Sequence, residues 1–283
     1  MKADILNTKG EKVKTIDLPE QFNEEVRPDI IKRAVLVIQA NKRQAYGANP
    51  RAGKDYSAKL SRRRRKYRGS YGHGISRVPR KILTRRGTNF YWVGAVAPGT
   101  VGGRRSHPPK SEKSWSQKIN VKERRLAIRS ALAATCIKEL VEKRGHVSKH
   151  VPIIIESGFE GLKSTKEVKE ALLKIGLEKE LERASVKKIR SGKGKRRGRK
   201  YKARKGPLIL VSGKCEIQKS AKNIPGIDVS VIDSVNAELL APGSEPGRLT
   251  IFTDKAIERL EKEKLFTGIK MEKAKEKTKG AKK

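Results

Sequence analysis

The sequence has few of the residues from which metal sites and disulfides are built. It contains two cysteines, Cys136 and Cys215, and four histidines among 283 residues. No CxxC pair occurs and the histidines are scattered, so no metal site of standard spacing is possible. We expect both cysteines to be reduced, structural thiols, and we expect no bound metal and no cofactor.

A targeting segment is also missing from the first residues. Met1 to Gly10 contain neither a charged segment leading into an apolar run nor a long hydrophobic stretch. We therefore expect no signal peptide, no membrane span and no membrane partner. A cytoplasmic location follows as an expectation.

Acidic residues are scarce beside basic ones. The chain has 69 Lys and Arg against 30 Asp and Glu, a formal net charge of +39. A free globule with that charge repels itself, so we expect a polyanion to balance it. Only 35% of the residues are apolar and 5% are aromatic. This is enough for one ordinary core but not for packing the whole chain around it, so part of the chain must lie outside the core.

The positive charge is concentrated in three segments. Residues 46–111 hold 17 Lys or Arg, ten glycines and one acid, without lasting helical or strand periodicity. Such segments are functional arms or disordered, and we expect this one to be unordered in the free protein. Residues 187–205 hold 12 Lys or Arg and no acid, which predicts a second basic loop. Residues 267–283, with seven lysines, are interpreted as a solvated tail or a third phosphate-contacting segment.

The remaining segments alternate between strand and helix patterns. We predict a mainly parallel α/β sheet with helices on both faces, doubly wound and Rossmann-like, with a long irregular basic extension. Capping boxes are predicted at Asn120 with Glu123 and at Ser164 with Glu167. The expected strands are 3–6 and 13–16 as a hairpin, 151–155, 208–211, 229–232 and 249–252. The expected helices start at Pro28 (with a strand as the alternative) and after Asn120, and cover 164–176, 178–189, 235–240 and 254–264.

These patterns divide the chain into six segments. The extension interrupts the globular body between its first helix and the helix after Asn120, which leaves the body discontinuous. The segments are 1–45 (first part of the body), 46–111 (basic arm), 112–190 (body), 191–206 (second basic loop), 207–266 (last part of the body) and 267–283 (lysine-rich tail).

The basic segments supply the residues that we expect to contact nucleic acid. Arginine binds phosphates through two parallel hydrogen bonds and stacks on bases, and glycine lets the backbone approach a nucleic acid closely. A nuclear-localisation signal or a non-specific charge run is the alternative. The candidates are Arg51, Lys54, Lys59, Arg62, Arg63, Arg64, Arg65, Lys66, Arg68, Arg77, Arg80, Lys81, Arg85, Arg86, Arg104, Arg105, Lys110, Lys193, Lys195, Arg196, Arg197, Arg199 and Lys200.

Aromatic residues are interleaved with the charge of the arm. They could stack on unpaired bases, or they could pack against protein neighbours or one another. They are Tyr67, Tyr71, Phe90, Tyr91 and Trp92.

No motif predicts catalysis. The glycine-rich stretch 192–198 lacks the GxxxxGK[ST] spacing of a nucleotide-binding loop, and we expect no strand directly before it. Contact between its backbone and RNA phosphates is the better interpretation. An RNA-modifying enzyme would need a nucleophile with its base, clustered acids or metal ligands, and we find none of these. We therefore expect no catalytic residue.

Several separate motifs occur in one order along most of the chain. They are Gly72-His73-Gly74 leading to Arg77-Val78-Pro79-Arg80, Gly102-Gly103-Arg104 leading to Pro108-Pro109-Lys110, the run from Arg124 to Ala134, Gly192-Lys193-Gly194-Lys195, and Asn223-Ile224-Pro225-Gly226-Ile227. In these motifs the sequence resembles the family of ribosomal large-subunit protein four, in the branch shared by archaea and eukaryotes. It departs from the family pattern at residues 81–93, which are less glycine-rich and more aromatic. The short lysine tail, without the long eukaryotic extension, favours the archaeal side.

The resemblance implies a structural, rRNA-binding role in the large ribosomal subunit. The arm would thread through rRNA to the wall of the polypeptide exit tunnel, with its tip near residues 76–86 and with Arg77, Val78, Pro79 and Arg80 at the constriction. The implied partners are large-subunit rRNA, neighbouring large-subunit proteins including the other protein of the tunnel constriction, and the nascent peptide. The alternative is a regulatory RNA-binding protein that represses its own message.

Overall fold

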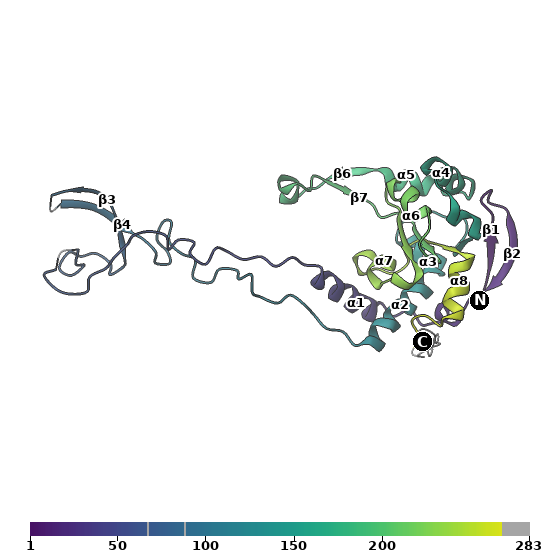
Figure 1. Ribbon diagram of the computed structural model, residues 1–283, viewed down its shortest axis with the longest axis horizontal. Coiled ribbons are helices and arrows are strands. Elements are labelled where there is room, and N and C mark those ends of the chain that lie inside the picture. The colour runs from purple at the N-terminus through teal and green to yellow at the C-terminus, as the bar shows by residue number, and fades with distance from the viewer. Residues whose placement is uncertain (67, 88, 268–283) are drawn as a thin grey trace, which may run out of the picture. The chain divides into compact units, whose positions relative to one another are not determined.

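The computed structural model describes residues 1–66, 68–87 and 89–267, with the Phe90 side chain left out. It divides into two units (Figure 1). The body comprises Met1–Asn41 and continues from Gln117, and the arm comprises Lys42–Ser116. The predicted lysine-rich tail lies outside the described residues, apart from Thr267. The division of the chain into six segments stays a prediction.

The body is built on a six-stranded sheet of order β2-β1-β5-β10-β8-β9. β2 is antiparallel to β1, and the other four neighbouring pairs are parallel. The central strands β5, β8 and β10 are fully buried, as expected for parallel strands covered on both faces. The strands are β1 (Lys2–Leu6), β2 (Lys12–Asp17), β5 (Ile153–Ile155), β8 (Leu208–Val211), β9 (Asp228–Val231) and β10 (Thr250–Thr253).

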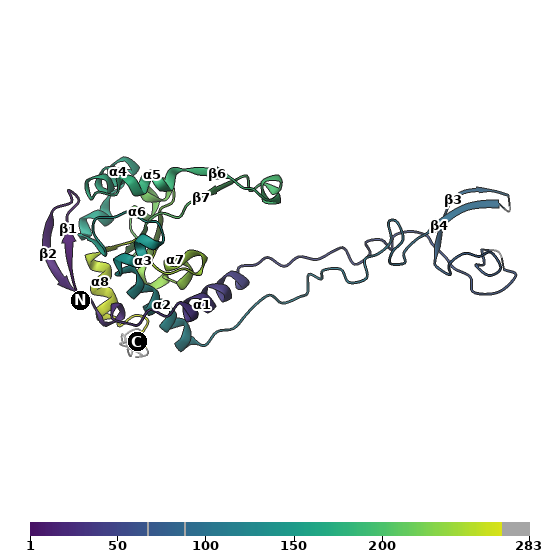
Figure 2. The same cartoon turned by 180° about the vertical axis from the view of Figure 1, so that it is seen from behind.

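Alternate residues of the strands feed two hydrophobic clusters, because successive side chains point to opposite faces of a sheet. Ile154 and Phe252 pack with α1 (Pro28–Asn41), α2 (Val121–Thr135), α7 (Ala237–Leu240) and α8 (Asp254–Lys262). Ile153 and Ile251 pack with α3 (Lys138–Lys143), α4 (Thr165–Lys174), α5 (Glu178–Ser185) and α6 (Ile217–Ser220). The same helices are seen from behind in Figure 2. The α/β class is confirmed, and the doubly wound, Rossmann-like description remains a prediction.

Short 3-10 helices connect these elements and shift some of the predicted boundaries. The expected strand 229–232 ends at Val231 because Ile232 opens a 3-10 turn, and the expected helix at 235–240 begins only at Ala237. The 3-10 helices of the body are η1 (Glu20–Phe22), η2 (Ser157–Gly161), η3 (Lys193–Arg197), η4 (Ala221–Asn223), η5 (Ile232–Ser234) and η6 (Pro242–Ser244).

The two predicted capping boxes have different outcomes. The Ser164 hydroxyl accepts from the Lys166 N–H, and the Glu167 carboxylate accepts from the Ser164 N–H, so the box at the start of α4 is confirmed. The box at Asn120 is wrong, because the Asn120 side chain makes no capping bond. The Glu123 carboxylate instead lies 2.7 Å from the guanidinium of Arg33 on α1.

One predicted helix is shorter in the structure. The stretch expected to be helical from Glu178 to Ile189 ends at Ser185, and Val186 is already extended. Lys187–Ile189 form strand β6, which pairs antiparallel with β7 (Tyr201–Ala203). All three residues of β6 are exposed, so no apolar face is available there to hold another helical turn against the body.

The arm contains a hairpin of β3 (Arg80–Arg86) and β4 (Asn89–Gly94). The expectation of no regular structure is therefore wrong for these residues. Strand-favouring side chains face each other here, for example Ile82 opposite Trp92. Apart from this hairpin the described arm has no helix or strand longer than an isolated bridge.

Hydrogen bonds join the two ends of the body between which the arm is inserted. The Asn41 side chain donates to the Gln117 carbonyl at 3.2 Å and accepts from the Gln117 N–H at 2.8 Å. This pair of bonds joins the last residue before the arm to the first residue after it. In the described part of the chain, no helix is long and apolar enough to cross a membrane.

Candidate nucleic-acid interface

Most of the predicted arm cations are on the surface of the arm. Thirteen are exposed: Arg51, Lys54, Lys59, Arg62, Arg63, Arg64, Arg65, Lys66, Arg77, Arg85, Arg86, Arg105 and Lys110. Arg68, Lys81 and Arg104 are half-buried, and Arg80 is buried. Arg51 pairs with Asp55, the one acid of residues 46–111, at 3.1 Å. The arm therefore presents far more positive than negative charge.

Some aromatic residues of the arm contact cations of the arm itself. The guanidinium of Arg77 lies 4.7 Å from the ring centre of Tyr71, and that of Arg80 lies 5.2 Å from Trp92. The Lys81 ammonium lies 3.8 Å from the ring centre of Tyr56. Such contacts stabilise an exposed site by about 0.5–1 kcal/mol each. Tyr91 is 64% exposed, Tyr67 lies outside the described residues, and base stacking by these aromatics remains a prediction.

Arg80 has a different position from the other predicted cations. It is 8% exposed, and its guanidinium donates to the Val78 carbonyl at 3.3 Å and to the Ser76 hydroxyl at 3.4 Å. The Ala95 N–H donates to the Pro79 carbonyl at 2.8 Å, which holds the segment against the end of β4. Of the two arginines that flank Pro79, Arg77 is exposed and Arg80 is buried.

Glycines allow the outgoing and the returning segment of the arm to come into backbone contact. A Cβ on Gly47 would lie 2.4 Å from the Ser111 nitrogen, and a Cβ on Gly53 would lie 2.5 Å from the Arg104 nitrogen. Only glycine fits such backbone-to-backbone approaches. The sequence segments before and after the hairpin are thereby held together without a hydrophobic core.

The second basic loop is the end of the β6–β7 hairpin, which projects from the body (Figure 1). The expectation that no strand precedes this loop is wrong, since β6 ends at Ile189. Gly198 takes a left-handed conformation with φ of 77° and closes the turn. All of the predicted cations of this loop are exposed: Lys193, Lys195, Arg196, Arg197, Arg199 and Lys200.

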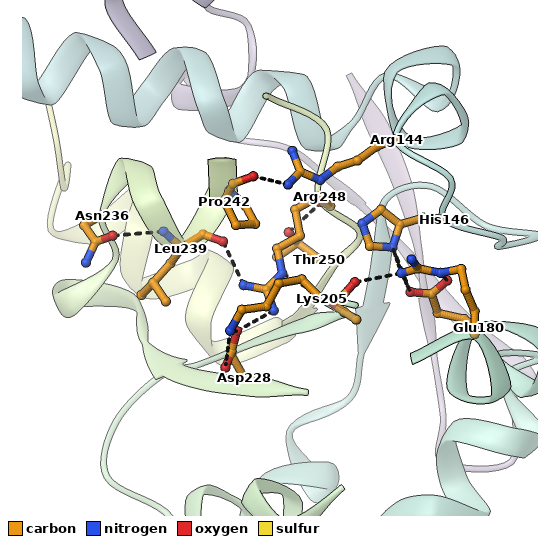
Figure 3. A network of polar contacts seen from close by, with 12 residues as sticks. Arg144, His146, Glu180, Lys205, Asp228, Asn236, Leu239, Pro242, Arg248 and Thr250 are labelled. Atoms are coloured by element: carbon orange, nitrogen blue, oxygen red, sulfur yellow. Dashed lines mark hydrogen bonds and ion pairs between the residues drawn. The ribbon is translucent and has the colours of Figure 1, made fainter. Parts of the chain in front are cut away.

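A buried ionic network lies at the base of this hairpin (Figure 3). Glu180 is fully buried, and its carboxylate lies 2.7 Å from His146 Nδ1 and accepts from Arg183 at 2.6 and 2.8 Å. Burial raises the pKa of Glu180, but the bonds from Arg183 and His146 outweigh burial and leave it below its usual range. Arg183 also donates to the Lys205 carbonyl at 2.7 Å, which ties the return strand of the hairpin to α5.

A second ion pair, between a buried arginine and a partly buried aspartate, continues the network. Arg248 is fully buried and donates to the Gly206 and Leu239 carbonyls, both at 2.9 Å, and to the Asp228 carboxylate at 2.6 Å. Asp228 also accepts from Lys205 at 3.0 Å. Burial raises the pKa of Asp228, but the two cations together lower it below its usual range. Sequence reasoning missed these residues; the available signal was an arginine two residues before the buried strand β10, which begins at Thr250.

The comparison with known families decides the identity. The family model described as "Ribosomal protein L4/L1 family" matches residues 16–263. The chain belongs to the ribosomal protein L4/L1 family.

Archaeal members of the L4/L1 family are similar to almost the whole chain. The protein named large ribosomal subunit protein uL4 of Nanoarchaeum equitans is 55% identical over 268 residues, which cover 94% of this chain and 100% of the relative. The uL4 proteins of Archaeoglobus fulgidus and Methanopyrus kandleri are 48% and 45% identical, and each comparison covers 92% of this chain and 98% of the relative. The predicted resemblance, including its archaeal side, is confirmed.

Both thiols of this L4/L1 family member have raised pKa values. Burial raises the pKa of the Cys136 thiol to about 12, and burial together with nearby Glu160 raises the pKa of Cys215. Both cysteines are free, as expected. Because the thiolate is the nucleophilic form, these shifts argue against cysteine chemistry. Within the described residues no group of three His, Cys, Asp or Glu could hold a metal ion.

Proposed function

We propose that this chain is a structural constituent of the large ribosomal subunit and that it binds large-subunit rRNA through its arm and its β6–β7 hairpin. Family membership and the names of the archaeal relatives support this role. The observation that carries it is the lack of a core in the arm. Ala95 is the only buried hydrophobic side chain among the described residues of Lys42–Ser116.

A segment without a core needs a partner to become ordered. Fixing the backbone costs about 1–2 kcal/mol per residue, and the arm buries too little apolar surface to offset that cost. The cations Arg62, Arg63, Arg64 and Arg65 are consecutive, exposed and without any acid nearby in the sequence. RNA phosphates supply the missing negative charge, and bound counterions are released as the phosphates are neutralised.

We further propose that the end of the arm reaches the wall of the polypeptide exit tunnel. Arg77, Val78 and Pro79 lie directly before β3, and Leu83 and Tyr91 are 55% and 64% exposed on the β3–β4 hairpin. Exposed apolar side chains among cations suit contact with another large-subunit protein rather than with RNA alone. The nascent peptide would pass near Arg77, whereas the buried Arg80 shapes the turn.

Sedimentation of extracts of the source organism tests this proposal. The protein is followed by blotting across sucrose gradients run at low salt and after a high-salt wash. Retention in the large-subunit peak through the wash is the expected result, because many phosphate contacts are screened from salt inside the subunit. Release into light fractions at moderate salt would contradict a structural role and would favour the regulatory RNA-binding alternative.

A further inference from the structure

A cavity of about 750 Å³ lies at the base of the β6–β7 hairpin. Its wall comes from the end of α3, the end of α5, both strands of the hairpin, and η6. Part of the network in Figure 3 forms this wall, and the predicted loop cations Lys193 to Lys200 do not line it. The ionisable residues of the wall are Arg144, Arg183, Lys188, Lys202, Arg204, Lys205, His146 and Glu245.

The cavity has a strong excess of positive charge. Among its six Lys and Arg residues, Arg183 pairs with Glu180 and Lys205 pairs with Asp228. The other four, Arg144, Lys188, Lys202 and Arg204, have no ion pair within the described part of the chain. The unbalanced cations thus converge on the space from α3 and from both strands of the hairpin.

Two arginines of the wall, Arg144 and Arg183, are held in place by hydrogen bonds within the protein, without any ligand. Arg144 donates to the carbonyls of Pro242 and Glu245. Arg183 donates from Nε and Nη2 to the Glu180 carboxylate, and from Nη2 to the Lys205 carbonyl as well. A guanidinium carries five N–H donors, so the Nη1 donors of Arg183 stay available. Side chains fixed in this way lose little conformational entropy when they bind an anion.

The charges around Arg144 act on its pKa in opposite directions. Burial lowers this pKa most, the charge of Glu245 raises it, and the charges of Arg248 and Arg183 lower it. An anion in the cavity would offset these two neighbouring cations. The space beside Gly145 and Gly243, which both line the cavity, is open, because a Cβ on either would meet no atom within 4 Å.

We propose that this cavity binds a backbone phosphate of RNA, separately from the arm and from the loop at the end of the hairpin. The inference rests on the proposed rRNA-binding role. RNA fits better than an acidic peptide because the positive charge does not stop at the cavity. Residues 187–205 carry 12 Lys or Arg and no acid, so a ligand with one negative charge per nucleotide is matched along the whole hairpin.

A lysine footprint on the full chain tests the site without any mutation. The protein is acetylated with and without deproteinised archaeal large-subunit rRNA, and the modified lysines are quantified by mass spectrometry. We expect strong protection of Lys188 and Lys202, with no protection of the exposed lysines Lys166, Lys169 and Lys174 on α4. Protection of arm lysines without Lys188 and Lys202 would overturn this inference alone. No protection anywhere would overturn the proposed function as well.

A charge-matched pair of triple variants separates the effect of the cavity from that of net charge elsewhere on the body. The first carries Lys188→Gln, Lys202→Gln and Arg204→Gln, and the control carries Lys166→Gln, Lys169→Gln and Lys174→Gln. Both remove three exposed positive charges. We expect the dependence of log Kd on log salt to become shallower by about one to three units in the first variant only. Equal slopes in the two variants would mean that net charge alone acts and would overturn the site.

Discussion

The body and the arm use charged residues in opposite ways. In the body, the buried Glu180 carboxylate and the partly buried Asp228 carboxylate are each paired with two side chains, and most of these contacts join segments far apart in the sequence. In the arm, exposed Lys and Arg greatly outnumber the acids. The comparison indicates that charge contributes to the stability of the body itself, whereas most of the arm's exposed cations can contribute only through a partner.

The hydrophobic residues show the same division. Strands β5, β8 and β10 are buried completely, and their side chains feed clusters on both faces of the sheet. The described arm buries one hydrophobic side chain, Ala95. Since apolar burial is the main favourable term in folding, the body should fold without RNA and the arm should not become ordered without it.

Replacing Arg248 is the strongest way to test the structural role of charge in the body. Arg248→Met should destabilise the body by about 3–5 kcal/mol, because it leaves the Asp228 carboxylate and two carbonyls without their buried donor. Urea unfolding followed by circular dichroism measures this change. The control Lys262→Met removes an exposed ion pair with Glu258 and should cost less than about 1 kcal/mol. Similar costs for both would break the comparison.

Removing charge from the arm should have the reverse effect. A variant with glutamine at Arg62, Arg63, Arg64 and Arg65 should keep the stability of the body and lose roughly a few hundredfold in rRNA affinity near 0.2 M salt, if each contacts one phosphate. Filter binding over a salt series gives this value.

The matched control for the arm variant removes four exposed lysines near or on α4. Glutamine at Lys163, Lys166, Lys169 and Lys174 changes the net charge by the same amount. If this control loses as much affinity as the arm variant, the arm has no special role in binding. A fall in the unfolding free energy of the arm variant would show that its charges are structural after all.

Acid should weaken the body through the buried Glu180 carboxylate. The folded-state pKa of Glu180 lies below its ordinary value of 4.5, so the unfolded chain binds a proton more readily than the folded chain. Stability from this group is present above about pH 4.5 and is lost as pH falls through the lowered pKa. In urea unfolding at a series of pH values, Glu180→Gln should flatten this acid dependence. Glu258→Gln, at an exposed pair, should leave it nearly unchanged, and the opposite ranking would contradict the assignment.

The sequence predicts the parts of this fold that depend on local pattern. Runs such as Leu208 to Val211 are apolar throughout, which is typical of strands buried on both faces, and the structure places a strand there. The concentration of basic residues and glycines at 46–111 is likewise a local signal, and most of the exposed cations of the arm lie within that range. Both signals lie within short segments and need no knowledge of tertiary contacts.

The features that could not be predicted depend on contacts between distant segments. The end of α5 at Ser185 is set by the pairing of β6 with residues more than ten positions later. Burial of Arg80 depends on the bond from the Ala95 N–H to the Pro79 carbonyl, which holds the segment before β3 against the end of β4. The hydrogen bonds of Arg248 reach Gly206, 42 positions away. An isolated arginine has the same sequence signal whether it binds RNA, closes a turn or lies in a buried network.

Helix capping gives a finer test inside the body. Ser164→Ala should destabilise the protein by about 1 kcal/mol, because the Ser164 side chain accepts from the first turn of α4 and Glu167 bonds back to it. Asn120→Ala removes a residue at the same capping-box spacing but should cost only a few tenths of a kcal/mol. The reason is that Asn120 makes no capping bond and Glu123 forms an ion pair with Arg33. Thermal or urea unfolding of the two variants side by side measures the difference. Equal losses would mean that the Asn120 box forms in solution and that the Arg33 pair does not compete with it.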